Sequence, residues 1–99
     1  MMVNETLFRQ VVERALERVQ GNKQWTNAIK RGAELIQTNR CLEIEEGGTL
    51  LILSESGHNY AVNEICRTEQ GLCPAYKNRK PCKHRAAFRL WQLYNERKH

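Results

Sequence analysis

Three cysteines and one histidine lie within nineteen residues of one another in the C-terminal half of the 99-residue chain. They are Cys66, Cys73, Cys82 and His84, with the spacing Cys-x6-Cys-x8-Cys-x-His. Thiolate and imidazole groups are ligands that zinc prefers, and four of them complete a tetrahedral shell. We therefore predict that these four side chains bind one zinc ion. Because four protein ligands leave no position for water, the ion is expected to be structural and not catalytic.

Other interpretations of the cysteines stay open from the residues alone. The cluster could hold three reduced cysteines and a core histidine without metal. Cys41, which we expect to be a half-buried strand residue, could be the fourth ligand only if Cys66 is not one. Disulfide pairing inside the cluster would leave one of its three cysteines over. The N-terminus lacks the basic and apolar segments of a secretion signal, so we expect a cytoplasmic protein, where clustered thiols favour metal over disulfides.

Two helices are predicted ahead of the cluster. Apolar residues recur at helical spacing in two successive segments, 5–20 and 25–36. Asn4 and Asn22 are placed to cap the first turn of each helix with their side-chain oxygens. Residues 1–39 are therefore expected to form an antiparallel helical hairpin with facing apolar stripes.

A small antiparallel sheet is predicted next. Residues 40–45 alternate in polarity, residues 49–55 are rich in β-branched and apolar types, and residues 60–65 form a third such segment. Turn residues separate them at Gly47-Gly48 and at Ser56-Gly57-His58-Asn59. The simplest arrangement of these segments is a three-stranded meander.

A last helix is predicted from Arg85 to Arg97, because its apolar residues again recur at helical spacing: Ala87, Phe88, Leu90, Trp91 and Tyr94. The predicted class is α+β, with two N-terminal helices, a short antiparallel three-stranded sheet, a zinc-binding loop and a C-terminal helix. We expect one compact domain in which the hairpin, residues 1–39, precedes a zinc-binding ββα module, residues 40–99.

The spacing of the last two candidate ligands restricts their local structure. Side chains two residues apart do not share a face of a helix. Cys82 and His84 can therefore reach one ion only if Cys82 lies in an extended segment and His84 in the first helical turn. Pro81 supports this, because it keeps Lys80 out of the helical conformation. The helix N-terminus would then lie near the Cys82 thiolate and lower the pKa of its thiol.

Several short motifs surround these ligands, and they span about residues 49–95. They are Tyr60-Ala61-Val62, Cys73-Pro74-Ala75-Tyr76, Pro81-Cys82-Lys83-His84 and Ala86-Ala87. Together they resemble the SWIM zinc finger family, whose pattern is Cys-x-Cys, a variable gap and Cys-x-His. The resemblance implies one zinc ion and a role in binding nucleic acid or protein. The family pattern would place its first cysteine at position 71, where this chain has Gly71. The nearest upstream cysteine is Cys66, at the start of what we predict to be a lengthened loop.

The net charge of +5 is concentrated in the same region. Residues 1–50 hold seven Lys/Arg and seven Asp/Glu, whereas residues 51–99 hold nine and four. Six basic side chains belong to the predicted loop or to the exposed face of the last helix: Lys77, Arg79, Lys80, Lys83, Arg85 and Arg89. A loop fixed by zinc would present them as one patch suited to the phosphates of DNA or RNA. Since phosphate contacts carry no sequence information, we predict a sequence-tolerant nucleic-acid-binding protein. Tyr76 could stack on a base or cover the metal site.

Three other interpretations stay open. The basic face could be a solvated surface, and the N-terminal helices could make the chain a protein–protein interaction adaptor. An enzyme with a catalytic zinc ion would require that Cys66 is not a ligand. SWIM modules occur beside transposase, helicase and ubiquitin-ligase domains, but residues 1–39 are too few for a catalytic domain and contain no phosphate loop, paired carboxylates or nucleophile motif. No enzymatic activity is therefore expected. The longest apolar run, Leu50 to Leu53, is far shorter than the ~20 residues of a membrane span, so no membrane partner is expected.

Overall fold

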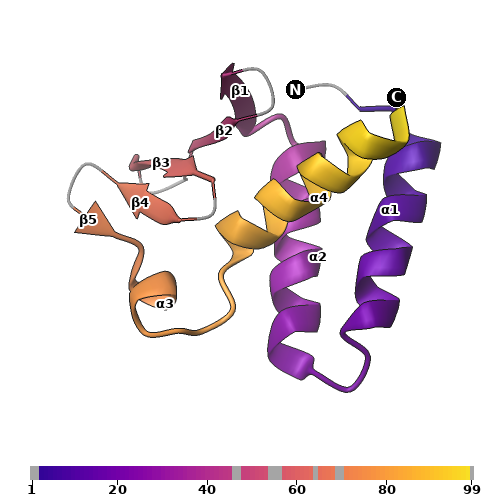
Figure 1. Cartoon of the computed structure of the whole chain (residues 1–99), viewed down its shortest axis with the longest axis horizontal. Helices are drawn as coiled ribbons and strands as arrows, with labels where there is room; N and C mark the ends of the chain where they lie inside the picture. The colour runs from indigo at the N-terminus through magenta and orange to yellow at the C-terminus, as the bar shows by residue number, and fades with distance from the viewer. Residues whose placement is uncertain (1–2, 46–47, 54–56, 64, 69–70, 99) are drawn as a thin grey trace.

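The structure is a computed structural model that describes residues 3–45, 48–53, 57–63, 65–68 and 71–98. Helices α1 (Glu5–Arg18) and α2 (Lys23–Gln37) come first, the short helix α3 (Pro74–Lys77) follows the sheet, and α4 (Lys83–Lys98) comes last. Five strands lie between α2 and α3: β1 (Cys41–Glu45), β2 (Thr49–Leu53), β3 (Asn59–Val62), β4 (Cys66–Thr68) and β5 (Gly71–Leu72). Figure 1 shows α4 crossing α2, with the sheet beside the start of α4. The predicted α+β class is confirmed.

Both N-terminal helices begin where the sequence predicts. The Oδ1 atom of Asn4 accepts a hydrogen bond from the Leu7 N–H at 3.1 Å, and that of Asn22 accepts one from the Trp25 N–H at 3.1 Å. Each bond satisfies an amide that has no partner inside its own helix. The two caps therefore fix the starts of α1 and α2.

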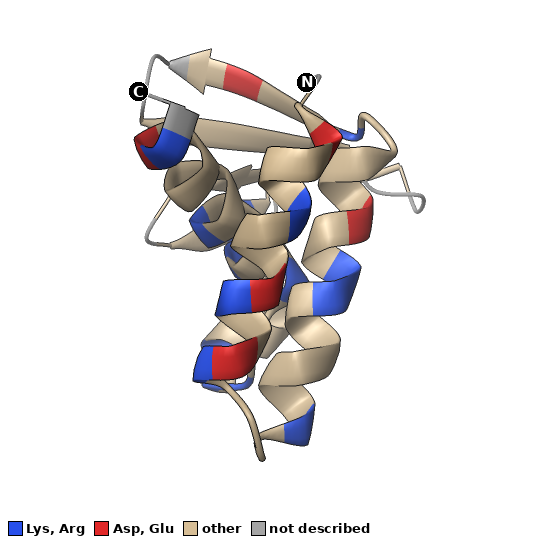
Figure 2. Ribbon diagram, turned by 90° about the vertical axis from the view of Figure 1, so that its right-hand side faces the viewer, with Lys and Arg blue, Asp and Glu red and all other residues tan. Residues whose placement is uncertain are grey.

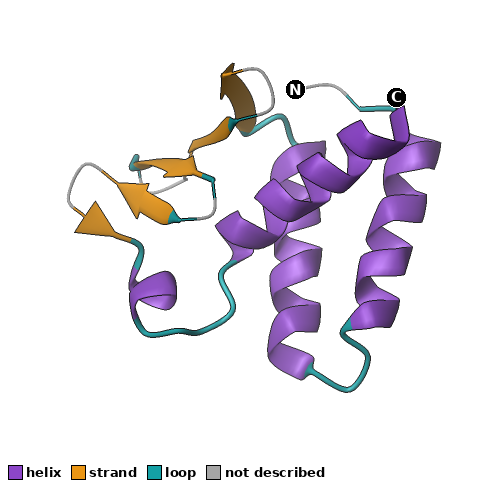
Figure 3. Cartoon of the chain, viewed as in Figure 1, coloured by secondary structure: helices purple, strands orange, loops and turns teal. Residues whose placement is uncertain are grey.

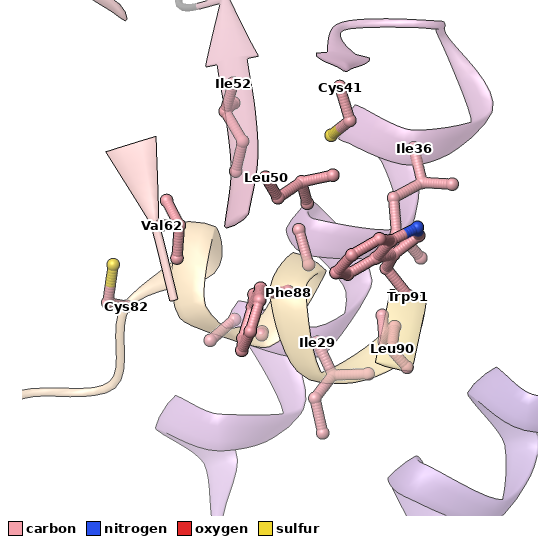
Figure 4. Packing of buried hydrophobic residues seen from close by; sticks show 14 of the residues in the cluster. Ile29, Ile36, Cys41, Leu50, Ile52, Val62, Cys82, Phe88, Leu90 and Trp91 are labelled. Carbon is pink, nitrogen blue, oxygen red and sulfur yellow. The ribbon is translucent and has the colours of Figure 1, made fainter. Parts of the chain in front are cut away.

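One cluster of buried side chains joins all three long helices to the sheet. Phe8 of α1, Ile36 of α2, Leu50 of β2 and Trp91 of α4 are each at most 2% exposed. Figure 4 shows Trp91 beside Ile36, with Leu50 next to them. The predicted inward stripe of the last helix is confirmed, since its five apolar residues are all buried. The two N-terminal stripes thus pack on α4 as well as on each other.

Helices α2 and α4 approach closely at Gly32. A Cβ atom placed on Gly32 would lie 2.7 Å from the backbone nitrogen of Ala87 and 2.8 Å from the carbonyl oxygen of Lys83. Only a glycine fits such an approach without displacing the neighbouring backbone. The contact therefore determines where the first turn of α4 lies.

The sheet has five antiparallel strands in the order β1-β2-β3-β4-β5, and not the three that we predicted. The two additional strands come from the segment that we predicted to be a lengthened loop. They form a tight hairpin in which Arg67 lies opposite Leu72 and Thr68 opposite Gly71. Strands of three and two residues are too short to produce a recognisable alternation of polar and apolar residues. This explains why the sequence did not predict them.

The first strand turns its cysteine toward the core. Cys41 lies opposite Ile52 and is 0% exposed, so it is fully buried and not half-buried as expected. Leu42 and Ile44, on the other side of the alternation, are 47% and 54% exposed. The predicted alternation is present, but its apolar side faces outward.

Figure 3 shows the three long helices, α1, α2 and α4, on one side of the molecule and the strands on the other, with the short helix α3 on the side of the strands. Within the described ranges, no helix is both long enough and apolar enough to cross a membrane. Of the predicted turns, residues 47 and 56 lie outside the described residues, as do residues 54 and 55 of the second predicted strand.

Candidate metal centre

The four predicted ligands come together from three parts of the chain. Cys66 is the first residue of β4, Cys73 follows β5 directly, Cys82 precedes α4, and His84 is the second residue of α4. Their candidate ligand atoms all lie within 4.8 Å of one another. The four side chains are at most 6% exposed. They form a buried Cys3His group that could hold one metal ion.

The β4–β5 hairpin explains how cysteines seven positions apart meet. Strand β4 leaves from Cys66, and β5 returns to Cys73, whose N–H donates a hydrogen bond to the Cys66 carbonyl at 3.0 Å. Facing positions of an antiparallel ladder project their side chains to the same face of the sheet. Gly71 adopts a left-handed φ of 122°, which glycine tolerates without strain. The hairpin therefore returns the chain to the position opposite Cys66, where Cys73 lies.

Cys82 and His84 adopt the arrangement that their spacing predicts. Helix α4 begins at Lys83, and the Ala86 N–H donates to the Cys82 carbonyl at 3.0 Å, so Cys82 occupies the position just before the first turn. The Cys82 Sγ lies 3.5 Å from the Nδ1 of His84. Nδ1 is therefore the nitrogen that faces the thiols, and Nε2 is the ring nitrogen left to carry the proton when a metal is bound.

The three distances among the ligand atoms of Cys73, Cys82 and His84 are close to those of a tetrahedral zinc shell. The Sγ atoms of Cys73 and Cys82 are 3.8 Å apart, and the His84 Nδ1 lies 4.0 Å from Cys73 Sγ and 3.5 Å from Cys82 Sγ. With Zn–S bonds of about 2.3 Å and Zn–N bonds of about 2.0–2.1 Å, ideal tetrahedral angles require separations of about 3.8 Å between sulfurs and about 3.6 Å between sulfur and nitrogen. The donor set and its geometry both fit a single ion.

The thiols of Cys66 and Cys82 shift each other's pKa in opposite directions because they are buried together. The pKa of Cys82 is lowered to about 3, first by a hydrogen bond from the Cys66 thiol and then by His84 and the backbone N–H of Arg85. The pKa of Cys66 is raised, first by that same hydrogen bond to Cys82 and then by burial. Helix α4 thus contributes an amide to the Cys82 thiolate, as predicted from the position of its N-terminus. Three adjacent buried thiolates repel one another, so a divalent cation is needed to ionise all three.

Tyr60 of β3 stacks on the candidate histidine ligand. The two rings have centroids 3.9 Å apart and planes inclined by 17°. The sequence placed Tyr60 in a family motif but gave it no role at the site. The stack fixes the plane of the imidazole and so aims Nδ1 at the sulfurs.

A small cleft gives access to the centre. It has a volume of about 260 Å³ and is lined by Cys73, Cys82 and His84 together with polar side chains of α2 such as Gln24 and Asn27. A metal ion or a chelator therefore has a route to the ligands that does not require the core to open.

No protein-family model, curated protein or solved structure matches the chain.

A second cleft, of about 400 Å³, is lined by residues of α2, β5, α3, α4 and the segment between α3 and α4, and is hereafter called the basic cleft. Seven residues line it: Trp25, Leu72, Tyr76, Lys77, Arg79, Lys80 and Arg85. It brings together four of the six basic residues predicted to contact nucleic acid. Lys83 and Arg89 do not line it, and instead border two neighbouring clefts. The sequence also missed Trp25, which we predicted to belong to the apolar stripe of α2.

The charge of the basic cleft contrasts with that of helix α1. Along α1, acidic and basic residues alternate, as Figure 2 shows. None of the described residues that line the basic cleft is acidic. The Arg85 guanidinium lies over the Tyr76 ring, 5.3 Å from its centroid, which is a favourable cation–π arrangement.

Proposed function

We propose that this chain is a zinc-binding module of the SWIM type that binds nucleic acid and catalyses no reaction. The observation that carries the proposal is that the lining of the basic cleft includes residues next to the candidate ligands in the chain, Leu72 before Cys73 and Arg85 after His84. Four cations, with no acidic side chain among the described residues that line the cleft, suit the phosphate backbone of a nucleic acid. Phosphate contacts of this kind give affinity with little sequence preference.

Zinc is the metal that best suits the site. Three thiolates and one imidazole at tetrahedral spacing favour zinc over magnesium or calcium, which prefer oxygen ligands. Four protein ligands satisfy zinc completely and leave no open position for a catalytic water. A structural role for the metal follows from this donor set.

The metal would connect the two segments that carry the cationic residues. Helix α3, with Lys77 in its last turn, follows Cys73 directly, and Arg85 lies three residues after Cys82. An ion that binds both cysteines fixes the start of α3 relative to the start of α4. The chemical contribution of zinc is thus to hold the walls of the basic cleft at a constant separation.

Metal analysis and a salt titration test the proposal together. We expect one zinc per purified chain, with X-ray absorption fitting three sulfurs and one nitrogen. Affinity for a labelled oligonucleotide should fall with salt, by about 0.9 in log K per neutralised phosphate per tenfold increase on duplex DNA and about 0.7 on single strands. Lys80→Ala and Arg85→Ala should each reduce that slope by close to one phosphate contact.

The matched control is Arg14→Ala, which removes one positive charge from the exposed face of α1 beside Glu13. It should leave both the affinity and the salt dependence at the wild-type value. A zinc-loaded protein that binds neither duplex nor single strands at low salt would exclude the nucleic-acid function.

The protein-interaction adaptor is a second candidate, favoured by a different feature. A groove of about 470 Å³ between α1, α2 and α4 has an apolar floor that includes Val19, Ile29 and Leu93, and Arg18 and Arg89 border it. Such a groove could bind an apolar side chain of a partner protein. Co-purification of one defined partner that survives nuclease treatment, and is lost in Leu93→Asp, would favour this function.

A further inference from the structure

The basic cleft contains aromatic side chains as well as cations. Trp25 comes from the first turn of α2 and Tyr76 from α3, so two distant segments of the chain each supply a ring. Both side chains are only partly buried, whereas the other tryptophan, Trp91, is 2% exposed and belongs to the core. The cleft thus combines two accessible rings with four positive charges.

This combination suits an unpaired base better than a duplex. In a duplex the faces of the bases are covered by their stacked neighbours, and only the phosphates and the base edges remain accessible. In a single strand the faces are exposed, and proteins that bind such strands combine cationic grooves with aromatic rings on which bases stack. A volume of about 400 Å³ also lies within the range of about 300–1,000 Å³ that is typical of small-ligand pockets.

One cationic residue of the basic cleft has an energetically unfavourable backbone conformation. Two residues after α3 ends, Arg79 adopts a left-handed φ of 57°. The Arg79 N–H donates to the Tyr76 carbonyl, and the Lys80 N–H donates to the Ala75 carbonyl at 2.8 Å. This position after a helix is usually taken by glycine, because a side chain is strained there. An arginine at this position supplies a guanidinium at the expense of the stability that glycine would give.

We propose that the basic cleft binds single-stranded nucleic acid, with an unpaired base stacked on Trp25 or Tyr76 and the flanking phosphates bound by Arg79, Lys80 and Arg85. This inference rests on the proposed function and adds the form of nucleic acid that the cleft selects. Stacking is insensitive to base identity, since every base has an aromatic face. The same chemistry would serve DNA and RNA.

The first test compares a 12-nucleotide oligo-dT, an oligo-U of equal length and a 12-base-pair duplex at about 20 mM salt. We expect both single strands to bind at least about tenfold more tightly than the duplex, because base stacking contributes about one to two factors of ten in affinity. Binding should quench the fluorescence of Trp25. The Trp25→Phe variant should lose this quenching, because the fluorescence of the buried Trp91 should not change on binding. The ratio of the affinities for oligo-U and oligo-dT then shows whether the cleft prefers RNA or DNA.

Substitutions in the basic cleft distinguish the contribution of base stacking to binding from that of positive charge. Trp25→Leu and Tyr76→Leu keep apolar volume and should weaken single-strand binding about five- to tenfold with little effect on the duplex. Tyr76→Phe keeps the ring and should bind like the wild type. Arg79→Gly keeps the loop conformation and should weaken binding of every oligonucleotide while leaving the unfolding temperature equal or higher.

The outcomes distinguish this inference from the function on which it rests. Equal or tighter binding of the duplex would overturn single-strand selection and leave nucleic-acid binding intact. Wild-type affinity of both leucine variants for single strands would overturn the stacking assignment. No binding to any of the three oligonucleotides would overturn the proposed function and this inference together.

Discussion

His84 supplies the one nitrogen of the candidate metal centre, and its orientation depends on a single aromatic neighbour. The Tyr60 ring lies parallel to the imidazole, with centroids 3.9 Å apart. Residues that orient a ligand affect metal affinity although they do not touch the metal. Tyr60→Leu should therefore lower zinc affinity, by up to about tenfold, when measured by competition with a chromophoric chelator.

Tyr60→Phe is the control, because it keeps the ring and removes only the hydroxyl. Its zinc affinity should equal that of the wild type. If Tyr60→Leu also bound zinc with wild-type affinity, the stack would have no part in positioning His84.

Residue types alone predicted the four candidate ligands but not the neighbouring residue that positions one of them. Cys66, Cys73, Cys82 and His84 were predicted together because sulfur and imidazole donors are rare and were clustered in the chain. The role of Tyr60 depends on β3 lying against the first turn of α4, which is a tertiary contact. The helical spacing of Trp25 likewise places it in the apolar stripe of α2 and does not reveal that it also lines the basic cleft.

At the scale of elements, the crossing of α2 and α4 determines where the last two ligands lie. Gly32 lets the two backbones approach, and a Cβ atom there would lie 2.7 Å from the Ala87 nitrogen. Gly32→Ala should therefore destabilise the protein, by about 1–3 kcal/mol, in spite of the higher helix propensity of alanine. Since the displaced turn of α4 carries His84, the variant should also bind zinc less tightly. Chemical denaturation and chelator competition measure the two effects.

Lys30→Ala, at an exposed position of the same helix, is the matched control for this substitution. It should leave the free energy of unfolding within about 0.5 kcal/mol of the wild type. If Gly32→Ala were as stable as Lys30→Ala, α2 and α4 would be able to move apart without a loss in the free energy of unfolding, and the prediction would be wrong.

The elements differ in how well the sequence predicts them. Helices α1, α2 and α4 were predicted because each is long enough to repeat an apolar stripe, and the caps at Asn4 and Asn22 mark two of their starts. Strands β4 and β5 were missed because their pairing is set by a hairpin turn and not by a pattern of polarity. A glycine inside a helical stripe, such as Gly32, is a signal of close packing that could have been used.

At the scale of the whole molecule, the candidate metal centre is continuous with the core. Cys66, Cys73 and Cys82 belong to the same buried cluster as Leu50 and Trp91. Without a cation, this part of the core contains thiols that resist joint ionisation, whereas one bound ion would join the start of β4, the start of α3 and the start of α4 at one point. The stability of the fold should therefore depend on the metal.

Chelation is the measurement that tests this dependence. Structural zinc in small fingers contributes an apparent ~10–16 kcal/mol to folding, which matches or exceeds the ~5–15 kcal/mol total stability of an ordinary domain. Excess chelator should therefore collapse the dispersion of the amide spectrum for at least residues 60–95, and added zinc should restore it. Two cysteine variants provide the controls. Cys41→Ala should show the same metal dependence, because Cys41 lies across the core from Cys82, as Figure 4 shows.

The amide spectrum of Cys66→Ala should instead resemble that of the chelated wild type at every zinc concentration that saturates the intact site. A chelated protein with an unchanged amide spectrum would show that the core holds these elements without a metal.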